Sequence, residues 1–426
     1  MKNVWLILVI GVLFLSSCKE DEIPVVTGDF RVTIENVFEG KDYLKSGEIN
    51  PGGLAPGNAF EFSFEAGLGT YLSFATMFVQ SNDLFYAPAP EGISLYPGGT
   101  PLTGDITNQV DLWDAGTEVN EEPGVGVNQA PRQSGPDTGV EENGNVLLID
   151  DVADGYTYPS DESVLEVTIV HDGATGFTVT IRNISDGSSL PTPLAPGVYV
   201  IHESGTPLFV ENQPSANGLE PLAEDGGNGG LLTFLDDRSG FFSPFAPGVW
   251  AIHPQGTAPL FSDGAPDFGE GLEVLAEDGD PAELNGSLAV NTDVSSNGVF
   301  NTPDGAAGPG PLLPGQSYSF SFSATQGDYL SLATMLVQSN DLFAGFDDIG
   351  LSLFPNGVPI SGNVTDQIDL WDVGTEVNEY PGAGANQPLR GGGNSGPAEN
   401  GNVVIVDDGF TYPSVSEMVR ITITVQ

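Results

Sequence analysis

Residues 71–85 read YLSFATMFVQSNDLF, and residues 329–343 read YLSLATMLVQSNDLF. The offset of 258 residues (329 − 71) also relates DLWDAGTEVN at 111–120 to DLWDVGTEVN at 369–378. A register kept over this length without a gap indicates a duplicated folding unit, and the period is too long for a solenoid repeat or a propeller blade. The chain of 426 residues is therefore predicted to hold tandem domains.

Short alternating runs bounded by Gly and Pro occur throughout the sequence, and they are typical of β-strands. Residues 59–65 (AFEFSFE) place three Phe side chains on one face, and residues 318–323 (YSFSFS) repeat this pattern. Matching runs at 164–170 and 419–425 close the two units. Many short strands with regular turn signals predict an all-β fold, with one antiparallel β-sandwich in each unit.

The boundary between the units is expected near residues 171–176, because FTVTIRN at 177–183 restarts the pattern of FRVTIEN at 30–36. The second unit carries an insertion at 190–310, which contains a smaller repeat, LAPGVYVIH at 194–202 and FAPGVWAIH at 245–253. The first unit lacks both copies. We therefore expect an abridged unit at 30–170 and a complete unit at 177–426.

The N-terminus has the pattern of a bacterial lipoprotein signal. Lys2 is followed by an apolar run at 5–15 and by LSSC at 15–18, and Cys18 is the only cysteine of the chain. Residues 1–18 are predicted to be a signal peptide and 19–29 a tether. Lipid on Cys18 is expected to anchor the protein to the outer membrane, exposed at the cell surface.

The net charge of -49 excludes a nucleic acid or a bare anionic membrane as an expected partner, since both need a basic surface. Ten Lys plus Arg stand against 59 Asp plus Glu. Two interpretations remain open: the acidity serves solubility, or some carboxylates are neutralised by divalent cations.

The repeated acidic segment suits calcium, which takes six to eight oxygen ligands with little demand on geometry. Asp111, Asp114 and Glu118 lie within eight residues, and Asp83 follows an apolar strand elsewhere in the unit. The second unit repeats this candidate metal site as Asp341, Asp369, Asp372 and Glu376. Alternatively, Asp83 and Asp341 cap turns through their own backbone, as Asx residues commonly do.

The aromatic residues of the same segments have two readings. Trp113 and Trp371 are either core anchors or exposed platforms for a sugar or protein partner. His202 and His253 occupy matched strand positions, but no Cys or second nearby His completes a zinc site. We expect them to be hydrogen-bonded, half-buried side chains.

Several ordered motifs resemble the spondin N-terminal domain family. They are FSP at 242–244, GVWAIH at 248–253, LAEDG at 275–279, SFATM at 73–77, SNDLF at 81–85 and DLWDAGTE at 111–118. The resemblance covers 177–426 in full and 30–170 in part. It implies two tandem C2-like antiparallel β-sandwich domains, calcium bound at a loop end, and the adhesion or matrix association of animal members. The chain lacks the cysteines of those members and has Glu118 or Glu376 where they have Asp.

The sequence thus predicts a non-enzymatic, calcium-binding adhesion or matrix-association lipoprotein, whose partner is an extracellular protein or glycan. No nucleophile elbow, zinc-protease helix or phosphate loop occurs in the sequence. The alternative is a glycan-binding or glycan-active lipoprotein of a polysaccharide uptake system.

Overall fold

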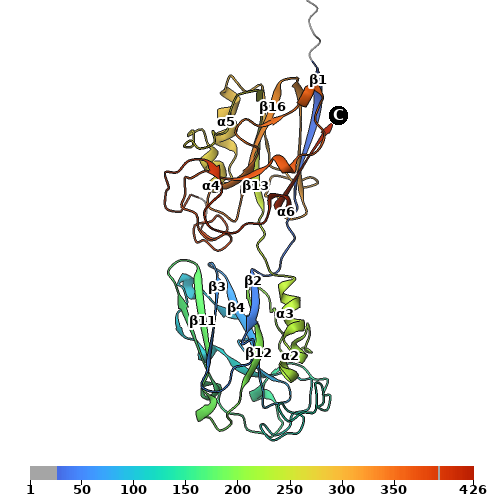
Figure 1. Cartoon of the computed structure of the whole chain (residues 1–426), viewed down its shortest axis with the longest axis vertical. Coiled ribbons are helices and arrows are strands. Elements are labelled where there is room, and N and C mark those ends of the chain that lie inside the picture. Colours follow the sequence, from blue (N-terminus) through green and yellow to red (C-terminus); the bar gives the residue numbers. More distant parts are fainter. Residues whose placement is uncertain (1–25, 392–393) are drawn as a thin grey trace, which may run out of the picture.

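The computed structural model describes residues 26–391 and 394–426 (Figure 1). The predicted signal peptide, the acylation site at Cys18 and most of the predicted tether lie outside these residues. Within them, no helix has the length and apolar character needed to cross a membrane. Strands hold 33% of the residues and helices 14%, and the antiparallel sheets form two sandwich-like halves, which confirms the predicted all-β class.

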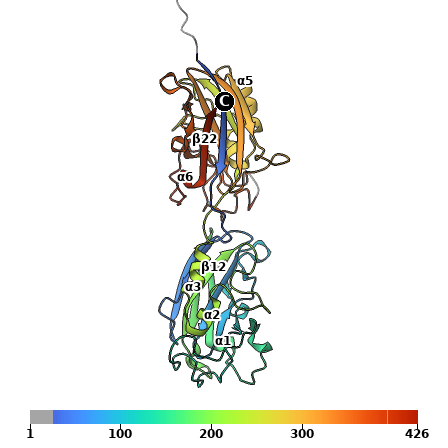
Figure 2. The ribbon, with the colours of Figure 1, turned by 90° about the vertical axis from the view of Figure 1, so that its right-hand side faces the viewer.

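Domain 1 is a sandwich of two antiparallel sheets with a helical layer on one side (Figure 2). One sheet has the strand order β3-β11-β10-β7, and the other has the order β2-β12-β4-β5-β8-β9, with β6 paired to β4. The strands are β2 (Lys45–Ile49), β3 (Ala59–Glu65), β4 (Tyr71–Phe78), β5 (Leu84–Ala87), β6 (Ile93–Ser94), β7 (Gly104–Asp105), β8 (Asp111–Asp114), β9 (Leu147–Leu148), β10 (Leu165–His171), β11 (Gly176–Asn183) and β12 (Leu194–His202). The helices are α1 (Asp161–Val164), α2 (Leu219–Asp225) and α3 (Gly229–Asp236).

Domain 2 repeats this architecture. Its sheets have the orders β15-β1-β22-β19 and β14-β13-β16-β17-β20-β21, with β18 paired to β16. The strands are β1 (Thr27–Asn36), β13 (Phe245–Pro254), β14 (Ser296–Phe300), β15 (Ser317–Thr325), β16 (Asp328–Leu336), β17 (Leu342–Gly345), β18 (Leu351–Ser352), β19 (Gly362–Asn363), β20 (Asp369–Asp372), β21 (Val404–Ile405) and β22 (Val419–Val425). The helices are α4 (Leu272–Asp278), α5 (Ala282–Val290) and α6 (Val415–Met418).

The strand β1 belongs to domain 2, although it comes first in the chain. It pairs with β15 on one side and with β22 on the other, both antiparallel. Its counterpart β11 fills the same position in domain 1, between β3 and β10. The two strands also end in the same kind of contact. The side-chain amide of Asn36 donates to the carbonyls of Ser243 and Leu312, and the side-chain amide of Asn183 donates to those of Leu54 and Thr192.

The expected division into 30–170 and 177–426 is therefore wrong, because the first strand of each expected unit belongs to the other domain. Residues 172–175 do not link two units; they are the turn of a hairpin in which His171 faces Phe177 and the Asp172 amide donates to the Gly176 carbonyl. A short loop costs little closure entropy, so β11 pairs with the strand that immediately precedes it. The remaining equivalent strand, β1, then completes domain 2.

The segment 190–310 is likewise not an insertion into one unit. Its first half supplies β12, α2 and α3 to domain 1, and its second half supplies β13, α4, α5 and β14 to domain 2. The pairing partners match, since β12 lies beside β4 and β13 lies beside the equivalent strand β16. Neither domain is abridged, because the smaller repeat is shared out between them.

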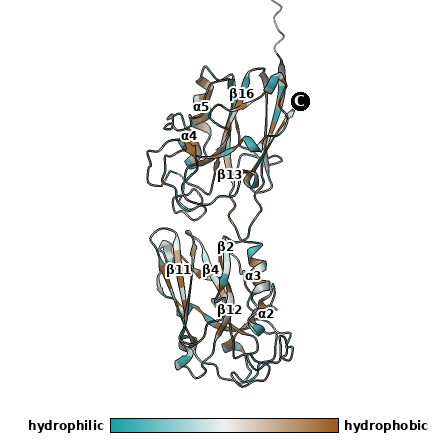
Figure 3. Cartoon of the chain, viewed as in Figure 1, coloured by the Kyte–Doolittle hydropathy of each residue, from teal (hydrophilic) through white to brown (hydrophobic). Residues whose placement is uncertain are grey.

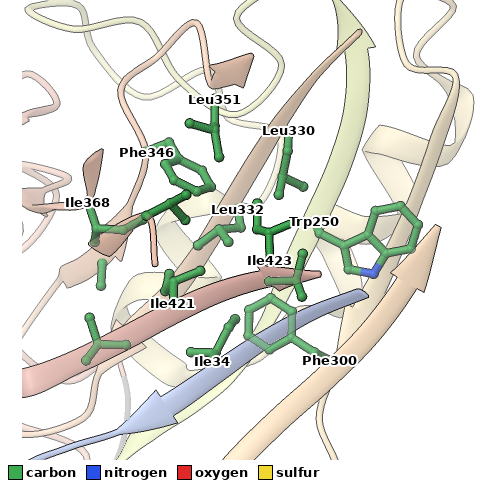
Figure 4. Packing of buried hydrophobic residues seen from close by; sticks show 14 of the residues in the cluster. Ile34, Trp250, Phe300, Leu330, Leu332, Phe346, Leu351, Ile368, Ile421 and Ile423 are labelled. Atoms are coloured by element: carbon green, nitrogen blue, oxygen red, sulfur yellow. The ribbon is translucent and has the colours of Figure 1, made fainter. Parts of the chain in front are cut away.

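Each domain has two hydrophobic cores, one on each face of its larger sheet. The core between the sheets of domain 2 contains the fully buried Phe30, Val32 and Ile34 of β1. Figure 4 shows Ile34 together with Trp250 and Ile421 in this core. The second core lies between the larger sheet and the helices, where Leu272 and Leu275 of α4 pack against Phe343. Apolar residues accordingly follow the strands and helices of both domains (Figure 3).

The domains meet end to end, and two chain segments cross between them (Figure 1). The loop at 379–391 of domain 2 reaches domain 1, where Arg390 forms an ion pair with Glu203 and donates to the Leu68 carbonyl at 2.8 Å. A cavity of about 480 Å³ at this junction is lined by Phe64, Phe241 and Tyr380, among others. Both described chain ends lie at the opposite end of domain 2, where the backbone amide of Gln426 donates to the backbone carbonyl of Asp29.

The placement of β1 predicts that a fragment of residues 241–426 does not unfold cooperatively by itself. Removing β1 takes away three buried apolar side chains, worth roughly 2 kcal/mol each, and leaves two strand edges unpaired. A peptide of residues 26–38 should restore a cooperative melt, followed by near-ultraviolet circular dichroism. The same peptide carrying Val32→Asp is the matched control and should not. A cooperative melt of the fragment without any peptide would show that β1 is dispensable.

Candidate functional site

A buried aspartate stands at the turn after β4 in domain 1 and after β16 in domain 2. Asp83 has no exposed surface, and its Oδ2 accepts hydrogen bonds from the amides of Thr117 (2.7 Å) and Glu118 (3.1 Å) and from the Thr117 hydroxyl (3.1 Å). Its Oδ1 has no hydrogen-bond partner. Asp341 has the same three donors from Thr375 and Glu376, and its Oδ1 also has no partner.

The alternative that these aspartates cap their own turns is wrong. Asp83 and Asp341 bond to residues 34 and 35 positions further along the chain. Serines cap the turns instead, since the Ser81 hydroxyl accepts from the Leu84 amide and the Ser339 hydroxyl from the Leu342 amide. The buried aspartates therefore hold the acidic loop against the end of the sandwich.

A second aspartate lies beside each of these buried residues. Asp114 accepts hydrogen bonds from the Gly116 amide at 2.7 Å and the Asn120 side chain at 2.6 Å, and Asp372 repeats this arrangement. Burial, and then the nearby charge of Asp114, raise the pKa of Asp83 to about 8. Burial and the charge of Asp372 raise the pKa of Asp341 to about 7. The structure thus brings Asp83 together with Asp114, and Asp341 together with Asp372.

Further carboxylates surround each pair. Glu142 and Asp154 contribute to the raised pKa of Asp114, and Glu399 and Asp408 contribute in the same way to that of Asp372, although burial is the main cause for both. The Tyr158 hydroxyl donates to Asp154, and the Tyr412 hydroxyl donates to Asp408 at 2.8 Å. These residues were not predicted from the sequence. Tyr-x-Tyr at 156–158 and Phe-x-Tyr at 410–412, each after an Asp-Gly pair, form a repeated signal that could have indicated them.

The carboxylates of Glu118 and Glu376 have hydrogen-bond donors of their own. Glu118 accepts hydrogen bonds from the Gly139 amide at 2.6 Å and from the Asn82 side chain at 3.2 Å. Burial raises its pKa, and the acidic neighbours that contribute are Asp225 and Asp137 rather than Asp83 or Asp114. Glu376 has equivalent donors in Gly396 and Asn340.

Asp111 and Asp369 do not join either group. Burial, and then the charge of Asp150, raise the pKa of Asp111. The charge of Asp111 in turn contributes to the raised pKa of Asp161 in α1, for which burial is the main cause. Asp369 lines a separate surface hollow with Asp366 and Ser416. The predicted set of four ligands in each unit is therefore divided among three places.

Two buried glutamates of the helical layer are not among the site residues that the sequence predicts. Glu224 in α2 and Glu277 in α4 are 5% and 2% exposed, and burial raises the pKa of each to about 7. Glu224 lies near Glu118 and Asp137, and the three can place ligand oxygens within 4.8 Å of one another. A signal is present in the sequence, because both glutamates stand in a duplicated LAEDG run, at 222–226 and 275–279.

The two tryptophans are core residues, so they are not exposed binding platforms. Trp113 and Trp371 are 4% and 2% exposed, and their indole N–H groups donate to the Ala87 and Gly345 carbonyls. Each ring packs against a phenylalanine of the helix-side core, Phe209 for Trp113 and Phe261 for Trp371. Of the two readings, the structure selects the core anchor.

The matched histidines are fully buried and hydrogen-bonded through both ring nitrogens. His253 Nδ1 faces the Pro254 carbonyl at 3.1 Å, and Nε2 faces the Ser331 hydroxyl at 2.9 Å. A carbonyl can only accept, so Nδ1 carries the proton and Nε2 accepts from the serine. His202 has the same arrangement with Ser204 and Ser73. Neither histidine has a nitrogen free for a metal.

No protein-family model matches the chain, and no curated protein matches it.

The aspartate pairs fit a hard divalent cation. All their donor atoms are carboxylate oxygens, which calcium prefers. The buried Oδ1 atoms of Asp83 and Asp341 lack a partner, and a buried carboxylate oxygen is costly unless a proton, a donor or a cation satisfies it. Glu142 and Asp154 in domain 1, and Glu399 and Asp408 in domain 2, add negative charge to these positions.

The buried histidines predict a pH-dependent loss of stability in mild acid. Burial lowers the pKa of His202 and His253, so the unfolded chain takes up protons that the folded chain does not. As the pH falls below about 6.5, the histidine contribution to the free energy of unfolding should decrease by up to about 1.4 kcal/mol per pH unit for each histidine, whereas the buried carboxylates with raised pKa contribute with the opposite sign. The free energy of unfolding of the double variant His202→Gln/His253→Gln, relative to that of the parent chain, should therefore rise as the pH falls from 7 to 5 in urea unfolding. Equal slopes for the variant and the parent chain would contradict this assignment.

Proposed function

We propose that this protein is a non-enzymatic, calcium-binding adhesion or matrix-association lipoprotein of a bacterial surface. The observation that carries the proposal is the duplicated pair of neighbouring aspartates, of which Asp83, Asp114 and Asp341 are buried and Asp372 is partly buried. In each pair, one carboxylate oxygen is buried without a partner and a second carboxylate lies beside it. Two buried like charges destabilise a fold unless a proton or a cation neutralises them.

Calcium is the cation that this donor set favours. Asp83 and Asp114 would hold it in domain 1, and Asp341 and Asp372 in domain 2, with waters and neighbouring carboxylates completing the coordination. The Asp83 and Asp341 side chains also accept from the amides of the acidic loop. A bound cation would therefore fix the loop to the sandwich and offset the repulsion between the paired charges.

Adhesion is supported by where the two acidic ends lie. The acidic end of domain 2 faces domain 1, while that of domain 1 is at the tip remote from both described chain ends (Figure 1). The loop residues Pro381, Gly382, Ala383 and Gly384 are buried, whereas Val125 and Val127 of the equivalent loop in domain 1 are 62% and 69% exposed. With lipid on Cys18, this tip would point away from the membrane and present a partly apolar surface to an extracellular protein or glycan.

The resemblance to the spondin N-terminal domain family supports the same proposal. Its motifs supply elements of both domains: SNDLF contains the buried aspartate, DLWDAGTE the acidic loop, and GVWAIH a strand of the larger sheet. Family membership remains part of the proposal, as do the outer-membrane location and the absence of catalysis.

Calcium should raise the melting temperature of the mature chain relative to the same chain in chelator. At a calcium concentration one hundred times the Kd, the gain is about 2.7 kcal/mol for a site that binds only the folded state. At a pH above the raised pKa of Asp83, where both members of each pair are charged, the double variant Asp83→Asn/Asp341→Asn should melt no lower than the parent in chelator, because it removes one buried charge per pair, but should gain less from calcium.

The matched control is Asp111→Asn/Asp369→Asn, which changes two predicted ligands that the structure places elsewhere. It should keep the full calcium response in the same thermal-unfolding measurement. A melting temperature that calcium and chelator leave unchanged in the parent chain would overturn the calcium assignment.

The junction cavity favours a second candidate function, glycan binding. It holds about 480 Å³ and combines Phe64, Phe241, Phe242 and Tyr380 with the polar Lys45 and Gln338. Aromatic faces beside hydrogen-bonding groups suit a sugar ring. A glycan-array screen should then find a ligand whose binding is weakened about tenfold or more by Tyr380→Ala. If Tyr380→Ala leaves the binding of that ligand unchanged, the cavity is not the glycan site. If the protein turns over a polysaccharide and changing a carboxylate pair abolishes this turnover, the non-enzymatic assignment is overturned.

A further inference from the structure

Each domain has a buried glutamate at the end of a helix that covers the larger sheet. Glu224 of α2 and Glu277 of α4 occupy the same position in the duplicated LAEDG run, and both are more than nine-tenths buried. Glu224 lies within reach of the Thr117 hydroxyl, and Glu277 within reach of that of Thr375. The helical layer therefore brings a carboxylate to the loop that follows β8 or β20.

In domain 1, this carboxylate completes a cluster of three. Glu118, Asp137 and Glu224 can each place one oxygen so that all three lie within 4.8 Å of one another. The backbone near Glu118 is shaped for this approach, because a Cβ on Gly139 would overlap the Glu118 carboxylate. Asp137 has a left-handed backbone (φ 50°), which an aspartate tolerates better than most residues. All three side chains are acidic and none is cationic, so their negative charges repel one another.

In domain 2, the equivalent glutamate has an unsatisfied oxygen. Glu277 is 2% exposed, and its Oε2 has no hydrogen-bond partner. The Thr375 hydroxyl lies within reach of both Glu277 and Asp341, and its single proton can satisfy only one of them. The strongest charge interaction of Glu277 is with Glu376, the counterpart of Glu118. The orphan oxygen thus belongs to a carboxylate that lies near the counterpart of Glu118, and the charge of Asp341 also acts on it.

We propose that each domain binds a second divalent cation between its helix glutamate and its loop glutamate, Glu224 with Glu118 and Asp137 in domain 1, and Glu277 with Glu376 in domain 2. This proposal extends the proposed calcium binding to a second, neighbouring position, which shares the Thr117 or Thr375 hydroxyl with the aspartate pair. The donors are all hard oxygens, and waters would fill the remaining coordination positions. Each glutamate oxygen that already accepts one hydrogen bond retains a lone pair for the ion.

The two domains should bind this second ion with different affinities. Asn394 of domain 2 occupies the place of Asp137, with a similar left-handed backbone (φ 45°). An amide oxygen is a neutral ligand, so domain 2 has one negative charge fewer at this position, and ligand charge sets calcium affinity. The domain 1 position is accordingly the tighter one.

A cation at this position would join two layers of the domain. Glu224 belongs to the helical layer, Glu118 to the loop at the sheet end, and Asp137 to the exposed loop of the tip. The ion would add to the hydrogen bond from the Gln133 side chain to Asp225, which already ties the tip loop to α2.

The test is a calorimetric titration of the intact mature chain with calcium chloride, repeated with magnesium chloride. Glu224→Gln and Asp137→Asn keep the side-chain shapes and should each weaken one calcium-binding event by at least about tenfold. Asp83→Asn should weaken a different event, so that the combination with Glu224→Gln affects both. Asn394→Asp should tighten a further event by restoring the charge that domain 1 has, and this gain does not depend on the folding of a weakened variant.

The outcomes separate the two proposals. If Asp83→Asn loses a calcium-binding event while Glu224→Gln, Asp137→Asn and Asn394→Asp all bind as the parent does, the second position is wrong and the proposed function stands. If Glu224→Gln and Asp137→Asn lose an event that Asp83→Asn retains, the second position is supported and the aspartate pair is wrong. A parent chain that takes up no calcium overturns both.

Discussion

The tight hairpin between β10 and β11 is the constraint on which the division of the chain depends. It closes over a few residues, with the Asp172 amide bonded to the Gly176 carbonyl, and it places β11 in domain 1. Once that position is filled, the second sandwich lacks one inner strand, and β1 is the segment whose pattern fits. The excursion from β1 through the whole of domain 1 and back to β13 follows from this choice. Closing so long a loop is tolerable because closure entropy grows only slowly with length.

The same division explains the smaller repeat. A sandwich of this kind needs one β12-type strand and one pair of covering helices, since the larger sheet would otherwise expose an apolar face to water. Two sandwiches need two copies, and the chain supplies both between β11 and β14. Each copy brings a buried histidine that accepts a hydrogen bond from a serine hydroxyl. Each copy also brings a buried glutamate that lies near the acidic loop. Packing and the candidate chemistry are therefore duplicated together.

Charge distinguishes the two ends of each domain. The loops after β8 and β20 gather buried carboxylates with few cationic side chains nearby, which is the repulsion that the proposed calcium ions would relieve. In domain 2 this end is covered by the junction, where Arg390 reaches Glu203 and the Leu68 carbonyl. In domain 1 the corresponding end is the free tip. The same acidic loop thus stands in two settings, one internal and one exposed, and the proposed binding surface belongs to the exposed one.

The sequence by itself determined the all-β class, the duplication and the aspartates at the ends of the apolar strands, because alternation, turn residues and repeated register are local properties of the chain. It indicated Asp83 with Asp114, and Asp341 with Asp372, which the structure does bring together. Only the tertiary structure decided that β1 serves domain 2, since FRVTIEN and FTVTIRN suit either sandwich equally well. It also decided that Asp111 and Asp369 point elsewhere, that both tryptophans are buried, and that Glu224 and Glu277 approach the acidic loops. Those outcomes depend on which elements pack across the sheet, and no spacing along the chain encodes that.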